Sequence, residues 1–221
     1  MSNPTQNALQ PQLDAQQAKS SAELTAVVDA LVAGIVADHI LASSLKEGDL
    51  APSFTLPDAL GHAVTLADVL EKGPVVLTFY RGEWCPYCNL QLHAYQAMLP
   101  EITALGASLI AISPQTPDHS LSMAEKHALS FAVLSDVGNR VARQFGVVFQ
   151  YDEAARHFFA DRGLDLARFN GDATWELPVP ATYVIAPDGV IRLAFVDPDY
   201  RHRLEPAELL DGLRTVAEGA H

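Results

Sequence analysis

Residues 74–92, PVVLTFYRGEWCPYCNLQL, decide the fold of this 221-residue chain. The unbroken apolar run over residues 75–80 predicts a buried strand, because it is short and rich in β-branched and aromatic side chains. The residues after Cys85 place apolar side chains at helical spacing as far as Gly106, which predicts a helix. Pro86 suits the first helical position, where its missing N–H costs nothing. Cys85 is therefore expected at the start of the helix, and Cys88 one turn later on the same face.

Cys85 and Cys88 are the only cysteines in the chain. A disulfide across so short a loop restrains the unfolded chain only weakly, so stabilisation is a poor explanation for the pair. A zinc site needs about four protein ligands, or three and a water molecule, and the nearest further candidate, His93, has no partner cluster. Two unrelated buried cysteines and a metal site stay open as alternatives. The spacing favours a redox-active dithiol that needs neither a metal nor an organic cofactor.

The start of a helix favours an anion, by up to about 2 kcal/mol. We therefore expect a lowered pKa at Cys85, which would make it the attacking thiolate, with the more buried Cys88 as the resolving thiol. Arg81 either helps to hold the thiolate or is simply solvated. Glu83 would oppose a nearby thiolate, so we expect it to point outward or to relay protons.

The overall composition is that of a water-soluble globular protein, with 49% apolar and 19% charged residues. The net charge of −13 argues against binding to nucleic acid or to an anionic membrane through bulk electrostatics. No stretch approaches the roughly 18 apolar residues of a membrane span. The amino-terminal residues have neither a basic segment nor an apolar one, so no secretory signal is visible, and a cytoplasmic location is expected.

The chain divides into a helical extension, residues 1–47, and a main domain, residues 48–221. Apolar side chains recur at helical spacing from Ser21 onward, which predicts a helix. Packing against the main domain is the simpler role for this helix. A dimerisation helix is the alternative, so a homodimer is possible.

The main domain alternates strands and helices, which predicts an α/β fold with a central mixed sheet covered on both faces. An insert over residues 149–177 interrupts this alternation, and we expect it to cap the site or to carry specificity. Asp199, Tyr200 and Arg201, ahead of the last helix, are candidates for the same rim. The expected strands are residues 54–56, 63–66, 75–80, 108–112, 131–134, 183–185 and 191–196, and further helices are expected at about 118–129, 139–145, 153–161 and from Pro206 onward.

Residues 79–92, FYRGEWCPYCNLQL, resemble the peroxiredoxin-like branch of the alkyl hydroperoxide reductase/thiol-specific antioxidant (AhpC/TSA) family, within the thioredoxin-like superfamily. The similarity covers about residues 48–216 and includes GDLAPSFTLP at 48–57 and VPATYVI at 179–185. The resemblance implies a thioredoxin-like fold in which Trp84 and Pro180 support the dithiol. It also implies a cis Val179–Pro180 bond that offers the backbone of Val179 to a substrate chain.

The chain departs from the usual peroxidase loop, which has Pro and then Thr or Ser seven and three positions before the nucleophile. Counted from Cys85, these positions are Thr78 and Gly82. The missing hydroxyl is expected to be replaced by that of Tyr80 or Thr78. Pro180 also stands where the family usually has an arginine on a late strand. Arg192, on the neighbouring strand, is a possible replacement, although a surface cation is the more ordinary role for such a residue.

The resemblance implies a thiol peroxidase in which a hydroperoxide oxidises Cys85 to a sulfenic acid. Cys88 then forms the Cys85–Cys88 disulfide, which thioredoxin or a similar dithiol reduces. A thiol–disulfide oxidoreductase acting on protein or small-molecule disulfides is the alternative enzyme. A non-enzymatic redox sensor, with the insert as its partner surface, is the third hypothesis. The sequence does not specify the preferred hydroperoxide, the reductant or the oligomeric state.

Overall fold

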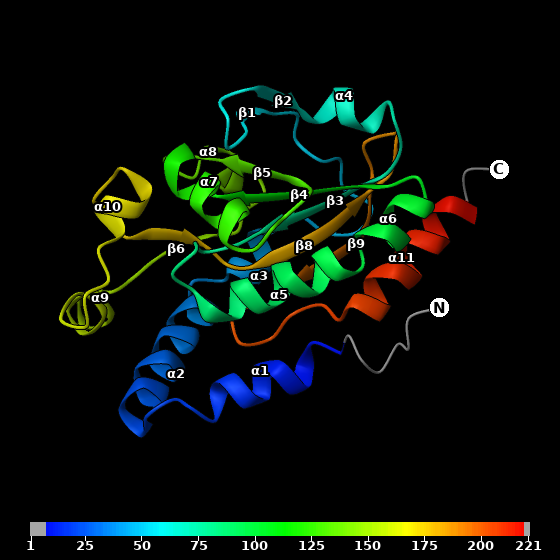
Figure 1. Ribbon diagram of the computed structural model, residues 1–221. Coiled ribbons are helices and arrows are strands. Elements are labelled where there is room, and N and C mark those ends of the chain that lie inside the picture. Colours follow the sequence, from blue (N-terminus) through cyan, green and yellow to red (C-terminus); the bar gives the residue numbers. More distant parts are fainter. Residues whose placement is uncertain (1–7, 219–221) are drawn as a thin grey trace.

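The computed structural model describes residues 8–218, and its centre is a five-stranded mixed sheet (Figure 1). Strand β3 lies in the middle, parallel to β4 and antiparallel to β8, while β5 and β9 form the two edges. The predicted mixed sheet is therefore confirmed. The strands, in their order across the sheet, are β5 (Ala132–Ser135), β4 (Ser108–Ser113), β3 (Val75–Phe79), β8 (Ala181–Ile185) and β9 (Ile191–Val196).

Strand β3 is buried along its whole length because helices cover both faces of the sheet. Alternate side chains of β3 enter different parts of the core, as the period of two in a strand requires. Val76 packs with side chains of α5 (Pro86–Ala97), α6 (Leu99–Ala104) and α11 (Pro206–Glu218). Leu77 packs on the other face, with side chains of α4 (Leu66–Leu70) and α8 (Arg140–Gln144).

The helix predicted from Cys85 to about Gly106 is two helices, α5 and α6, separated at Met98. Pro100 lies at the start of α6 and has no N–H to continue the hydrogen bonds of α5. The other elements of the main domain follow the predicted order with small shifts at their ends. They are the hairpin β1 (Thr55–Pro57) and β2 (Ala63–Thr65), and helix α7 (Pro117–Lys126), which packs on β5.

The insert begins and ends in two short strands that pair with each other, so it leaves and rejoins the main domain at one place. Strands β6 (Val148–Gln150) and β7 (Glu176–Pro178) pair antiparallel at its base. Between them lie helices α9 (Glu153–Ala160) and α10 (Leu166–Asn170), which Figure 1 shows at one end of the molecule. This strand pair keeps both ends of the insert next to the central sheet.

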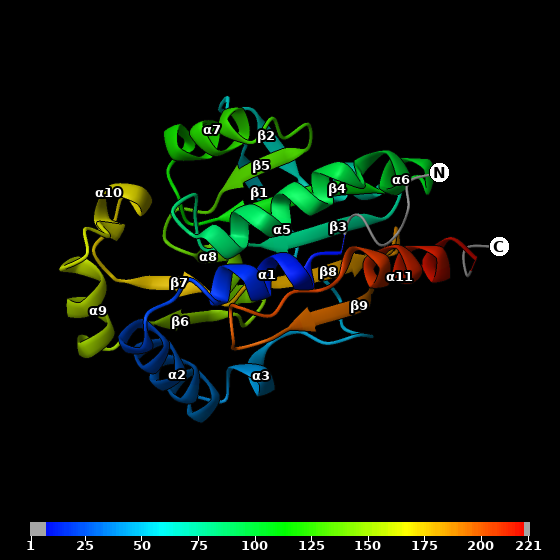
Figure 2. The same cartoon turned by 60° about the horizontal axis from the view of Figure 1, so that its bottom comes forward.

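The amino-terminal extension contains three helices in its described part, and its first seven residues lie outside the described residues. Helix α1 (Gln10–Gln17) lies along α5, and α2 (Ala22–Ala37) packs on α9, as Figure 2 shows. The short helix α3 (Ile40–Ser43) then leads into the main domain. Ser21 caps α2 by accepting a hydrogen bond from the N–H of Leu24. The predicted helix and its packing on the rest of the chain are confirmed.

The expected cis bond at Val179–Pro180 is wrong, because every peptide bond of the described residues is trans. Val179 joins β7 to β8 in an extended stretch, and its N–H donates to the carbonyl of Val147 over 2.7 Å. That N–H is therefore occupied within the fold, so it is not offered to a substrate chain.

Across residues 8–218, no helix combines the length and the apolar character needed to span a bilayer.

Candidate active site

The two cysteines follow the carboxyl end of β3, the central strand. Cys85 is the N-cap of α5, Pro86 occupies its first turn, and Cys88 follows in that turn, as predicted. Both are free thiols, and both are buried, with 1% of Cys85 and none of Cys88 exposed. Such burial disfavours a thiolate unless nearby positive charge and hydrogen bonds offset it.

Cys88 receives that support. Its Sγ accepts hydrogen bonds from the backbone N–H of Arg81, over 3.5 Å, and from Nη2 of Arg203, over 3.6 Å. Burial acts to raise the pKa of Cys88. The hydrogen bond from Cys85, the guanidinium groups of Arg203 and Arg81, and the N–H of Arg81 outweigh it and lower that pKa to about 5. Cys88 is thus the sulfur that carries a negative charge at neutral pH.

The predicted low pKa of Cys85 is wrong. Its side chain makes no capping hydrogen bond with the N–H groups of α5, so the helix start does not stabilise a thiolate there. Burial raises the pKa of Cys85, and the hydrogen bond to Cys88 and the charge of Cys88 raise it further. Cys85 is therefore the protonated member of the pair.

Arg81 is buried beside the dithiol, which supports its role in holding the thiolate over the alternative that it is solvated. Its guanidinium lies 3.7 Å from the ring centroid of Tyr200 and 4.8 Å from that of Trp84. Nη2 donates to the hydroxyl of Tyr151 over 2.7 Å. Its Nε and Nη1 have no hydrogen-bond partner among the described residues. Two further donors of this buried cation thus stay free near the cysteines.

Glu83 is held away from the dithiol by two cationic or polar partners on α7. Its carboxylate lies 2.7 Å from Nδ1 of His119 and 3.0 Å from Nζ of Lys126. Partial burial raises the pKa of Glu83, but the hydrogen bonds from Lys126 and His119 outweigh it and lower that pKa. The carboxylate is thus paired with α7 and largely buried, so it does not point outward to solvent as expected.

The two proposed substitutes for the missing hydroxyl do not reach the space beside Cys85. Thr78 is buried on β3, and its hydroxyl lies 3.1 Å from that of Thr182. Tyr80 packs in the same apolar cluster as the cysteines but does not line that space. Pro180 is buried ahead of β8 and does not line it either.

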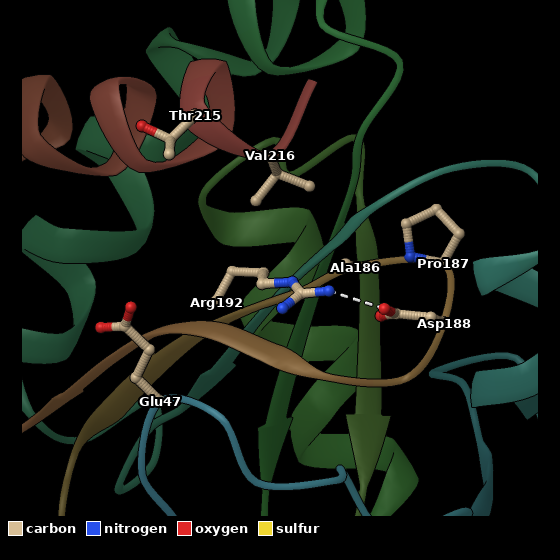
Figure 3. Close-up of a pocket in the computed structure, with 7 residues that line it drawn as sticks. All are labelled: Glu47, Ala186, Pro187, Asp188, Arg192, Thr215 and Val216. Carbon is tan, nitrogen blue, oxygen red and sulfur yellow. Dashed lines mark hydrogen bonds and ion pairs between the residues drawn. The ribbon is translucent and has the colours of Figure 1, made fainter. Parts of the chain in front are cut away.

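Arg192, the possible replacement for the family's arginine, lies in a different pocket (Figure 3). Its Nη2 pairs with Oδ2 of Asp188 over 2.6 Å. The sheet register explains the separation, because Val75 pairs with Ile185, and Ile185 with Ile191. Arg192 therefore lies near the beginning of β3, whereas the cysteines follow its end. Arg192 thus fits the role of a surface cation, and Arg203 is the cation that contacts the dithiol.

Arg203 was not predicted as a residue of the site, because no local sequence motif marks it. It precedes α11, and 115 residues separate it from the sulfur that it contacts. Of the three neighbouring candidates, Tyr200 packs on Arg81 at the site. Asp199 and Arg201 instead pair with each other over 2.7 Å.

A cavity of about 360 Å³ opens beside Cys85. Cys85, Arg81 and Trp84 line it, whereas Cys88 does not. The other walls come from the amino-terminal extension, the start of α5, the insert and the segment before α11: they are Gln16, Ser20, Leu24, Pro86, Tyr87, Phe159, Arg162, Gly163, Leu164, Phe169 and Tyr200. Within residues 8–218, no three histidine, cysteine or acidic side chains group in a way that could hold a metal ion.

Comparison with known proteins gives one family match and several similar proteins. The model of the AhpC/TSA family matches residues 48–194. Peroxiredoxin Bcp of Escherichia coli K12 is 37% identical over 103 residues, which cover 47% of this chain and 65% of that protein. The chloroplastic peroxiredoxin Q of Populus jackii is 28% identical over 169 residues, which cover 76% of this chain and 66% of that protein. The chain thus spans about two thirds of the length of these relatives.

Two solved structures have the same fold. The peroxidoxin BcpB of Mycobacterium tuberculosis superimposes with a TM-score of 0.61 at 26% identity, covering 78% of this chain and 98% of that one. A cysteine-to-serine mutant of the peroxiredoxin 6 of Arenicola marina gives a TM-score of 0.65 at 17% identity, covering 80% of this chain and 76% of that one. Both support the predicted thioredoxin-like arrangement.

Replacing Arg203 with glutamine is expected to raise the pKa of Cys88 from about 5 toward the ordinary thiol value of about 8.5, because the variant removes a positive charge next to the sulfur. The pH at which the thiolate absorbance disappears on acidification measures this pKa. Arg201→Gln is the matched control, since Arg201 pairs with Asp199 and Asp29. Equal titration midpoints in the two variants contradict the assignment of charge to Cys88.

Gly82 is expected to tolerate no side chain. Its φ is +148°, and a Cβ there would lie 2.4 Å from Nε1 of Trp84. We expect Gly82→Ala to lower the free energy of unfolding by about 1–3 kcal/mol more than Gly61→Ala, because Gly61 also has positive φ but open space around it. Urea unfolding of the two variants measures the difference. A similar loss in both would mean that Trp84 moves aside freely.

Proposed function

The chain belongs to the AhpC/TSA family, and from this membership we propose that it is a thiol peroxidase that reduces hydroperoxides with Cys85 and Cys88. One observation carries the proposal. A buried thiolate at Cys88, supported by Arg81 and Arg203, neighbours the thiol of Cys85, which lines a cavity. The similarity to proteins named peroxiredoxin supports the same activity.

The sequence pattern assigned the attack to Cys85, and the charge distribution leads us to propose Cys88 instead. A thiolate is the nucleophile, and the pKa of Cys88 is the lowered one of the pair. Counted from Cys88, the positions that the family fills with Pro and with Thr or Ser hold Arg81 and Cys85. Cys85 hydrogen-bonds to Cys88, whereas the count from Cys85 falls on Gly82, which has no room for a side chain.

The reaction then proceeds in two balanced steps. The Cys88 thiolate attacks the outer oxygen of the hydroperoxide, an S–O bond forms, and the O–O bond breaks. The leaving alkoxide takes the proton of the Cys85 thiol and departs as an alcohol. The Cys85 thiolate attacks the sulfenic sulfur of Cys88, an S–S bond forms, and the S–O bond breaks. The displaced hydroxide takes up from the solvent the proton that Cys88 released when it ionised, and it leaves as water. The peroxide gains the two electrons that the dithiol loses.

A thioredoxin-type dithiol completes the cycle by reducing this disulfide. The proposal includes a cytoplasmic location, because the cytosol keeps thiols reduced. It also includes a homodimer formed through the amino-terminal helices. The exposed apolar side chains of Val36 and Leu41 support this contact, and sedimentation equilibrium tests it.

Thiol–disulfide exchange is the second candidate, because the CxxC spacing at the start of α5 favours it. One observation opposes it. The N–H of Val179 is occupied by Val147, so the backbone contact expected for a substrate chain is missing. A redox-sensing surface on the insert is also less favoured, since Phe159 and Trp175 pack against the core.

Serine variants test the activity and the order of attack together. In stopped-flow mixing with a hydroperoxide, we expect the reduced wild-type protein to react orders of magnitude faster than a free thiol. Cys88→Ser should abolish this reaction, because the thiolate is lost. Cys85→Ser should keep one turnover that ends at a sulfenic acid, which dimedone labelling and mass spectrometry detect.

The opposite pattern, with one turnover in Cys88→Ser and none in Cys85→Ser, restores Cys85 as the attacking residue. A wild-type rate no faster than that of a free thiol rejects the peroxidase proposal. In that case reduction of insulin disulfides tests the second candidate.

A further inference from the structure

Arg81 is an arginine that the fold buries almost completely, with 2% of the residue exposed. A buried guanidinium is costly unless fixed partners compensate it. The rings of Tyr200 and Trp84 contact it through their faces, with 3.7 Å and 4.8 Å between the guanidinium carbon and the ring centroids. A ring face attracts a cation but does not set the direction of its N–H groups. The hydrogen bond from Nη2 to the hydroxyl of Tyr151, over 2.7 Å, does set that direction.

Tyr151 is a rigid partner for this bond. It directly follows β6 in the insert, and its own N–H donates to the carbonyl of Trp175 over 3.1 Å. Its ring stacks on that of Phe159 in α9 at a centroid distance of 5.2 Å, and 2% of the residue is exposed. Burial raises the pKa of Tyr151, so its hydroxyl stays neutral. The paired strands and the first helix of the insert therefore hold one hydroxyl in a fixed place beside Arg81.

Arg81 in turn acts on the dithiol. Its backbone N–H donates to Sγ of Cys88 over 3.5 Å, and its guanidinium favours the thiolate of Cys88. The other ionisable groups around Arg81 and Cys88 are the thiol of Cys85, the guanidinium of Arg203 and the hydroxyls of Tyr80, Tyr151 and Tyr200. Burial raises the pKa of all three tyrosines, so the two guanidinium groups carry the positive charge near the sulfur. The direction of one of them depends on Tyr151, which comes from a separate segment of the chain.

Resting on the proposed peroxidase function, we propose that Tyr151 is a positioning residue for the reaction at Cys88. Its hydroxyl fixes the guanidinium of Arg81 beside the sulfur, and it does not itself touch the reacting atoms. Tyr151→Phe keeps the aromatic ring but leaves a third donor of this buried cation without an acceptor, in addition to Nε and Nη1. The insert, which we expected to cap the site or to carry specificity, thereby supports the charge on the nucleophile.

Tyr151→Phe tests this role in the full-length reduced protein. The thiolate absorbance, followed on acidification, is expected to give a midpoint for Cys88 about 0.5–1 unit higher than in the wild type, because the guanidinium is no longer held beside the sulfur. The rate constant with hydrogen peroxide should fall about two- to fivefold at about pH 5, where fewer molecules carry the thiolate, and stay within about twofold at about pH 8. An equal fall at both pH values contradicts the proposal, since a structural defect lowers the rate at every pH.

Tyr183→Phe is the matched control. Tyr183 is also fully buried, but it lies on β8 and its hydroxyl has no hydrogen-bond partner among the described residues. This variant removes the same single oxygen atom from a tyrosine of the core, so the midpoint and both rate constants should stay at their wild-type values. A midpoint that moves equally in the two variants, or in neither, overturns the positioning role.

A double-mutant cycle measures whether Tyr151 acts through Arg81. In Arg81→Met the cation is absent, so the addition of Tyr151→Phe should shift the Cys88 midpoint by less than about 0.2 unit. An undiminished shift in this background means that the hydroxyl acts on the sulfur by another route, and it rejects the proposal. Circular dichroism identifies the variants that fold, and Arg81→Gln takes the place of Arg81→Met in the cycle if the latter does not.

The midpoints are measured without peroxide, so the two proposals fail independently. If the wild type reacts with hydroperoxides no faster than a free thiol, but the shift and the cycle are as expected, the peroxidase function is rejected and the positioning of Arg81 stands. A fast reaction with peroxide together with an unchanged midpoint in Tyr151→Phe rejects the positioning role alone.

Discussion

A negative charge on a fully buried sulfur is the constraint on which the site depends. Removing a thiolate from water is costly, so Cys88 can carry the charge only where cationic groups and N–H donors meet it. Arg203 and the N–H of Arg81 meet it directly. Arg81 is itself a buried cation and needs its own partners, which Tyr151 and Tyr200 supply. The loop after β3 and the segment before α11 therefore contact the sulfur of Cys88 directly. The insert is connected to it through the hydrogen bond between Tyr151 and Arg81.

The same arrangement explains why the two cysteines differ although they share one turn of a helix. Cys85 lines the cavity and its pKa is raised, whereas Cys88 does not line the cavity and its pKa is lowered. A thiol that lines the cavity and hydrogen-bonds to a thiolate can protonate a leaving oxygen and then close a disulfide. The additional helices and the insert contribute what the strand–helix unit of β3 and α5 lacks, namely a shaped apolar wall over the reacting pair.

Local sequence signals predicted the framework well. The apolar run of β3, Pro86 in the first turn of α5 and Pro206 at the start of α11 all act over a few residues, and the structure has each of them in place. The single helix predicted to Gly106 is interrupted at Met98 by a signal of the same kind, Pro100, which we had not used. The expected cis bond at Val179–Pro180 was inferred from a resemblance to a family, and the structure has a trans bond there.

The sequence by itself determined the fold class, the position of the dithiol and its redox character, because strand period, helix capping and CxxC spacing are local properties. Only the tertiary structure decided which sulfur carries the charge and what surrounds it. Arg203 contacts Cys88 although 115 residues separate the two in the sequence. Leu24 and Phe159 line the cavity beside Cys85 and come from separate segments of the chain. A pKa depends on charges and burial in space, and a cavity depends on which side chains converge, so neither follows from the order of residues along the chain.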